Sequence, residues 1–140
     1  QRPELISPRW RQIFGDTLAQ REDPSVLPLP AYAEIHAAHP ISDPDALAAL
    51  DDEHILTPDY AEERLRWRRK HPLWAVVLRV WRVDTPPLLR VGPEHGGCVS
   101  WGDLPADIGA PGSLTPALDE AAVAAAAGRV ESILTTGAPR

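Results

Sequence analysis

The chain contains no methionine, a single cysteine (Cys98) and a single lysine (Lys70). One cysteine excludes an internal disulfide framework and is typical of a reducing compartment, so we expect a cytoplasmic protein. Methionine is absent even from position 1, where Gln1 stands. The sequence therefore predicts that the chain is either a processed product or an N-terminally incomplete fragment, and we favour the fragment.

Long hydrophobic runs are missing as well. No stretch of about eighteen apolar residues occurs, and no secretory signal opens the chain. The sequence thus predicts neither a membrane span nor a membrane partner. With 140 residues, of which 44% are apolar, the chain can form one domain around one modest core.

Arginine, alanine and proline are abundant instead. The chain has 13 Arg against one Lys, together with 20 Ala and 16 Pro. This bias is typical of GC-rich coding sequence, so the number of arginines is no evidence of function. Only the placement of the arginines can indicate a site.

Four proline pairs mark expected helix starts, because Ser, Thr or Asp caps a helix and proline suits its first turn. These pairs predict helices from Pro8 past Phe14, with Gly15 interrupting or ending the first, and over 44–50, 58–70 and 115–134. Residues 21–30 read as a proline-rich extended connector. The alternation of apolar residues predicts strands over 31–41 and 73–84, with short extended segments at 88–91 and 98–101.

The order of these elements predicts an α/β or α+β fold, with a mixed sheet flanked by helices in a single domain. Its expected parts are a helix and connector over 1–30, a βααβ core over 31–104 and a C-terminal helix over 113–135. The βααβ unit is compatible with a parallel crossover. In the first strand, the face of Ile35 reads as more buried than the face of Tyr32 and Glu34. The second strand reads as covered on both faces at its start.

Residues 64–90 form a basic island of eight basic groups and one acid, Asp84, within a chain of net charge −6. Nearby tryptophans make this the composition of a nucleic-acid or phosphate surface. The alternative interpretation is structural, with helix-end arginines balancing the acidic stretch 43–63. The nucleic-acid candidates are Arg66, Arg68, Arg69 and Lys70.

Catalytic signals are weak. Cys98 could act as a nucleophile only with a depressed thiol pKa. Glu34 with His36 on one strand face could serve acid–base or hydrolytic chemistry. His95 and Cys98 have a ligand-like spacing but no partner pair, so no metal site is predicted. No phosphate-binding glycine loop occurs, and we expect no cofactor.

One stretch resembles a known family. The segment HILTPDYAEERLRWRRKHPLWAVVLRVWRVDTPPLLRVGPEHGGCVSWGDLP is similar to the C-terminal part of the uncharacterised bacterial family called domain of unknown function 1802. The matching positions are Arg64, Arg79, Pro86, Gly97, Cys98, Ser100, Trp101 and Leu104. The resemblance implies that strands with an Arg-Lys-Gly-Gly stretch precede Gln1, and that a site between them and Arg79 is half present. It implies no activity.

The leading hypothesis is a domain that binds an anionic ligand through an arginine-rich strand surface. The candidate ligand-binding residues are Arg64, Arg79, Arg82, Gly97, Cys98, Ser100 and Trp101. A bidentate guanidinium contact from Arg79 would supply the specificity. Three alternatives stay open: a nucleic-acid module, a hydrolase that uses Cys98 or Glu34 with His36, and a purely structural or partner-binding domain.

Overall fold

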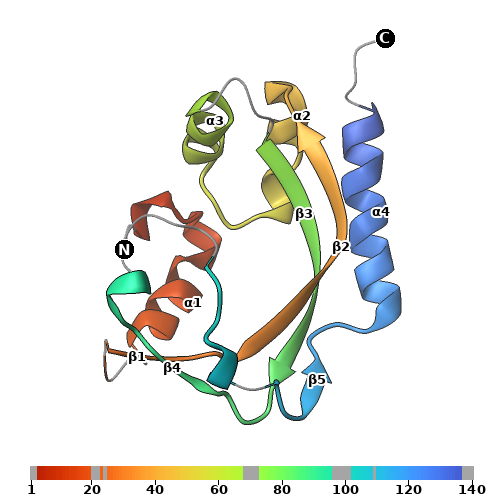
Figure 1. Ribbon diagram of the computed structural model, residues 1–140. Helices are drawn as coiled ribbons and strands as arrows, with labels where there is room; N and C mark the ends of the chain where they lie inside the picture. Colours follow the sequence, from red (N-terminus) through yellow and green to blue (C-terminus); the bar gives the residue numbers. More distant parts are fainter. Residues whose placement is uncertain are drawn as a thin grey trace.

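The computed structural model describes residues 3–19, 23, 25–67, 73–95, 102–108 and 110–136. Within them the chain forms two small antiparallel sheets with helices around them, an α+β architecture (Figure 1). This confirms the predicted fold class. The predicted segment 98–101 lies outside the described residues.

The larger sheet is built on two long strands, β2 (Ala31–Ile41) and β3 (Leu73–Val83), with the short β5 (Leu114–Pro116) on the other side of β3. The smaller sheet pairs β1 (Val26–Pro28) with β4 (Leu88–Arg90). All of these pairings are antiparallel. The expected parallel crossover is therefore wrong. The helices between β2 and β3 lie beyond one end of the two strands, so the chain returns alongside β2 in the opposite direction (Figure 1).

The helices are α1 (Pro8–Ala19), α2 (Pro44–Ala49), α3 (Pro58–Trp67) and α4 (Glu120–Thr136), with short 3₁₀ turns η1 (Pro3–Leu5), η2 (Asp51–Glu53), η3 (Pro93–His95) and η4 (Ala106–Ile108). The first three long helices begin at the predicted prolines. Gly15 does not end α1, which continues to Ala19. Asp43 caps α2 as expected, because its carboxylate accepts the backbone N–H of Asp45 at 3.1 Å.

The last helix begins later than the sequence predicts. Thr115 is no helix cap. It lies in β5, where it pairs with Arg82 of β3, and its hydroxyl donates to Asp84 Oδ1 at 3.0 Å. The cap is Asp119 instead, whose carboxylate accepts the backbone N–H of Ala122 at 2.8 Å. A Thr-Pro pair fits an edge strand as well as a helix start, and pairing with β3 decides between them here.

The core lies between one face of the two long strands, which we call the inner face, and the helices α2, α3 and α4. Its buried members are Ile41, Leu47, Leu50, Ala61 and Val130, with Leu65, Leu73, Ala75, Val77, Ile133 and Leu134 partly buried around them. Leu47 of α2 and Leu50 at its end thus point into this core. Among the described residues, no helix is long and apolar enough to cross a membrane.

Two helices are tied to η2 by ion pairs. Arg9 of α1 contacts Asp52 at 2.7 Å, and Arg129 of α4 contacts the neighbouring Glu53 at 2.8 Å. The hydrogen bond from Arg129 lowers the pKa of Glu53. A second tie holds the start of the chain, where the backbone N–H of Ser7 donates to Ile55 O at 2.8 Å. The acidic turn thus joins distant parts of the sequence.

Replacing a core leucine should destabilise the fold. Leu50 is 4% exposed and belongs to the core cluster, so Leu50→Ala should lower the free energy of unfolding by about 2–5 kcal/mol, through lost burial and a residual cavity. Leu118→Ala is the matched control, because Leu118 is 58% exposed. Urea denaturation at constant m-value measures both changes. Equal losses in the two variants would contradict this placement of the core.

Candidate functional site

The two long strands form a ribbon with two distinct faces, since side chains alternate along a strand. One of them, which we call the outer face, carries five residues of β2 and their five partners on β3. The pairs are Ala31 with Arg82, Ala33 with Val80, Ile35 with Leu78, Ala38 with Val76 and Pro40 with Trp74. The inner face carries the intervening residues, including the core members Ile41, Leu73, Ala75 and Val77. Helix α4 packs on this ribbon (Figure 1).

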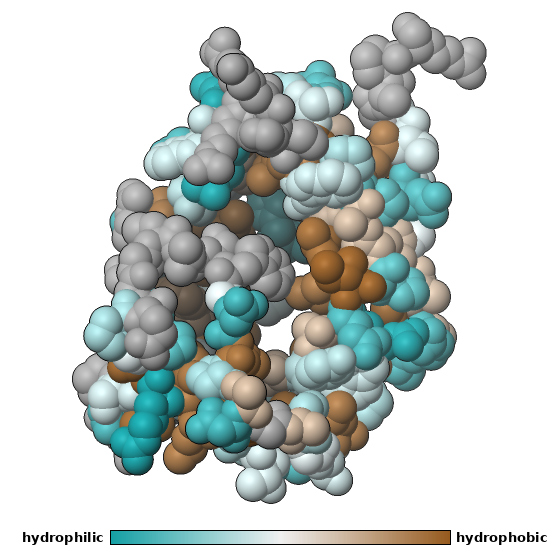
Figure 2. Space-filling model, viewed as in Figure 1, coloured by the Kyte–Doolittle hydropathy of each residue, from teal (hydrophilic) through white to brown (hydrophobic). Residues whose placement is uncertain are grey.

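The outer face is apolar and open. Ile35 is 64% exposed, Trp74 54%, Leu78 42% and Val76 38%. Figure 2 shows hydrophobic side chains gathered in the middle of the view, where the ribbon runs. The expectation that the start of β3 is covered on both faces is therefore wrong for the described residues.

A β-bulge explains why the predicted faces of β2 are exchanged. The register shifts between Ile35 and Ala37, and His36 has no partner on β3. The extra residue moves Ala37 to the opposite side from Ala33 and Ile35, so these three do not share a face. Helix α4 and the core lie on the side of Tyr32, Glu34 and Ala37, so Ile35 is left on the opposite side.

Polar groups cluster on the inner face near the start of α4. Arg79 forms an ion pair with Glu120, and its guanidinium carbon lies 5.9 Å from the centre of the Trp81 ring. The Tyr32 hydroxyl donates to Glu34 Oε1 at 3.1 Å, and this hydrogen bond raises the pKa of Tyr32. Glu34 lies opposite Arg79 across the two strands. These contacts fix the positions of the charged side chains, and the guanidinium of Arg79 is already paired with the Glu120 carboxylate.

The structure does not bring the predicted ligand-binding arginines together. Arg79 lies on the inner face, whereas Arg82 lies exposed on the outer face. Arg64 belongs to α3, where its guanidinium carbon lies 5.4 Å from the centre of the Trp67 ring. The remaining candidates, Gly97, Cys98, Ser100 and Trp101, lie outside the described residues. An anion at Arg79 would have to displace the Glu120 carboxylate.

The other candidate groups are only partly described. Arg66 pairs with Glu62 one helical turn earlier, and Arg68, Arg69 and Lys70 lie outside the described residues. Nucleic-acid binding stays a prediction. The proposed hydrolytic pair is separated by the bulge, since His36 is the extra residue while Glu34 bonds to Tyr32. In the described part of the chain, no three His, Cys, Asp or Glu side chains gather to hold a metal ion.

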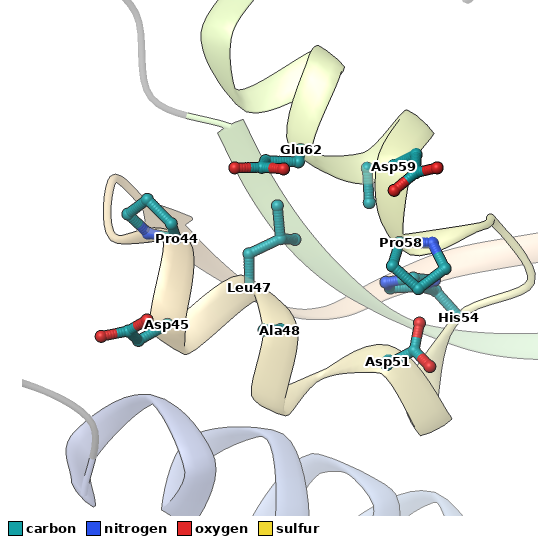
Figure 3. A pocket seen from close by; sticks show the side chains of 10 residues that line it. Pro44, Asp45, Leu47, Ala48, Asp51, His54, Pro58, Asp59 and Glu62 are labelled. Atoms are coloured by element: carbon teal, nitrogen blue, oxygen red, sulfur yellow. The ribbon is translucent and has the colours of Figure 1, made fainter.

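A shallow acidic pocket of about 370 Å³ lies between α2, η2 and α3 (Figure 3). Its floor is apolar, and its lining includes Leu47, Asp45, Asp51, Asp59 and Glu62. Within the described ranges the three aspartates form no ion pair, and the buried Nδ1 atom of the lining His54 has no hydrogen-bond partner. No sequence motif predicted this pocket. The signal was the run 43–63, which holds eight carboxylates and no lysine or arginine. The local charge repels anions.

The described residues thus form an α+β domain with an open apolar ribbon, and no catalytic group is assembled among them. The profile of the family described as Domain of unknown function (DUF1802) matches residues 1–128. The chain belongs to this family. A search of curated proteins found no match, and neither did a search of solved structures.

The Tyr32 hydrogen bond can be tested by titration. Glu34→Gln should lower the pKa of Tyr32 toward its ordinary value of 10.0, because the charged acceptor that favours the neutral phenol is removed. The raised pKa stabilises the fold below the unfolded value near 10, and this contribution is lost as the pH rises through the folded value. Tyrosinate absorbance in a Tyr60→Phe background measures the titration.

Glu131→Gln is the control for that titration, because it removes an exposed carboxylate of α4 for which no contact with Tyr32 occurs. The pKa of Tyr32 should not change in this variant. Circular dichroism at each pH must show that the fold persists. An unchanged pKa in Glu34→Gln would disprove the contact.

Proposed function

We propose that this domain is a non-catalytic interaction module whose outer face binds an extended polypeptide segment with alternate apolar side chains. The observation that carries the proposal is the exposure of Ile35, Trp74, Val76 and Leu78 on one face of the ribbon. Contiguous apolar surface of this kind marks interaction sites in folded proteins, because leaving it in water is costly.

The shape of the surface favours a polypeptide over a small ligand. Small molecules bind in concave sites that enclose most of their surface. The outer face is a strip that runs the length of two strands, and the described pocket of Figure 3 lies elsewhere, between α2 and α3. An extended chain matches such a strip, since every second side chain can face it.

Charge indicates one further property of the partner. Arg82 is the only charged residue of the outer face, at the end where it pairs with Ala31. It is exposed, and no ion pair occupies it among the described residues. A partner with an Asp or Glu at this end would gain a charge-assisted contact. The anionic-ligand hypothesis thus survives in a narrower form, at Arg82 rather than at Arg79.

Selection from a displayed library of random peptides tests the proposal. Enriched peptides should carry apolar residues at alternate positions and a carboxylate at one end. Ile35→Lys should weaken their binding at least about tenfold, because the interface would bury a charge. Arg82→Gln should weaken it about two- to fivefold, as expected for an exposed ion pair. Fluorescence anisotropy of a labelled selected peptide measures each affinity.

Two matched variants control for general effects of charge. Ile13 of α1 is 59% exposed, close to the 64% of Ile35, so Ile13→Lys should leave peptide binding unchanged. Arg90 is an exposed arginine of the other sheet, and Arg90→Gln should likewise have no effect. Failure to enrich any patterned peptide would refute the proposal, as would equal binding by the Ile35→Lys variant.

A further inference from the structure

The outer edge of β2 is a separate surface from the outer face. In the order β2-β3-β5, β3 is central, and β2 has a strand on one side only within the described residues. Backbone groups of an antiparallel strand point alternately to its two sides. The N–H of Ala117 donates to Val80 O, so Val80 points to β5, whereas Arg79 and Trp81 point to β2.

This alternation identifies the unpaired backbone groups of β2. Tyr32 and Glu34, opposite Trp81 and Arg79, point to β3, so Ala33 and Ile35 point to the open edge. After the bulge the parity changes. Ala37 points to β3 opposite Val77, and Ala38 points to the open edge. Pro40 also points to the open edge, where it offers only its carbonyl oxygen, because proline has no N–H.

The spacing of these open groups is irregular but symmetric. The open residues Ala33, Ile35, Ala38 and Pro40 are separated by steps of two, three and two residues. A regular strand offers a group every second residue and falls out of register at the bulge. A second β2 in antiparallel orientation offers the same steps in reverse, and therefore stays in register throughout.

Side chains agree with that register. About a two-fold axis between His36 and Ala37, Ile35 lies opposite Ala38 of the second copy, and outer-face residues meet outer-face residues. On the inner face Glu34 lies opposite His39 of the second copy, a carboxylate acceptor beside an imidazole donor. No like charges are opposed, and β2 carries no lysine or arginine of the kind that protects an open edge.

We infer that the outer edge of β2 pairs with β2 of a second copy of this chain, in the register that places Ile35 opposite Ala38. The two three-stranded sheets then form one continuous antiparallel sheet. Ile35 and Ala38 exchange N–H···O bonds in both directions, and Ala33 donates to Pro40 of the other copy. This pairing uses the strand edge, so it does not depend on the polypeptide-binding role of the outer face.

Sedimentation equilibrium of the 140-residue chain tests the pairing. The wild type should show a monomer–dimer equilibrium in the micromolar range, and Ala38→Pro should weaken the dimer at least about tenfold, because it removes an N–H that faces the open edge. Ala31→Pro is the matched control, since Ala31 faces the same edge but lies opposite position 42 of the second copy, beyond the end of β2. A wild type that stays monomeric overturns the inference, as does an Ala38→Pro variant that dimerises equally well.

Cysteine pairing tests the register without relying on proline variants. In a Cys98→Ala background, Glu34→Cys chains mixed with His39→Cys chains should form a disulfide on mild oxidation, because directly opposed residues have Cα atoms about 4.5 Å apart. Tyr32→Cys mixed with His39→Cys is two residues out of register, beyond disulfide reach, and should form none. Equal cross-linking in both mixtures, or none in the first, overturns the register.

The two sets of variants separate the proposals. Ile35→Lys tests the outer face in the peptide selection, whereas Ala38→Pro tests the edge in sedimentation. A dimer that fails to bind patterned peptides would refute only the proposed function. A monomer that binds them would refute only the pairing.

Discussion

The antiparallel pairing of β2 with β3 is the constraint on which the remaining structure depends. The segment between these strands folds into α2, η2 and α3 because both of its ends are fixed at the same end of the ribbon. The third strand attaches to β3, and α4 packs on the inner face. Without this pairing, the buried residues Ile41, Leu47 and Val130 would have no common surface to cover. The ribbon therefore organises both the core and the surfaces that remain open.

The sequence predicts the elements better than it predicts their faces. Proline pairs located the starts of α1, α2 and α3, and alternation located both long strands, because these signals are local. The bulge at His36 has no such signature, although one inserted residue exchanges the sides of β2. The start of α4 was misplaced for a similar reason, since Thr115 pairs with β3 through contacts distant in the sequence. Long-range pairing decided each of these outcomes.

The candidate site shows the same division. The sequence drew attention to Arg79 and Arg82 as one surface, but residues three apart on a strand point to opposite sides. Arg79 therefore meets Glu120 on the inner face of the ribbon, while Arg82 stays on the outer face. The exposed apolar strip could not be predicted, because its residues look like core until the other elements are placed. Among the described residues, this domain is distinguished by a sheet with an exposed apolar face and an unpaired edge strand, not by a set of reactive groups.

The acidic turn η2 gives the molecule a common response to its ionic surroundings. Asp52 and Glu53 are neighbours, so the dissolved ions that weaken the hold of one on Arg9 also weaken the hold of the other on Arg129. Helix α1 contributes no buried side chain, whereas α4 keeps Val123 and Val130 in apolar contact. Because screening acts on exposed charges and leaves apolar burial largely intact, rising ionic strength loosens α1 before α4. The ion pairs of this turn make both helices sensitive to salt, and the apolar burial of α4 decides that α1 detaches first.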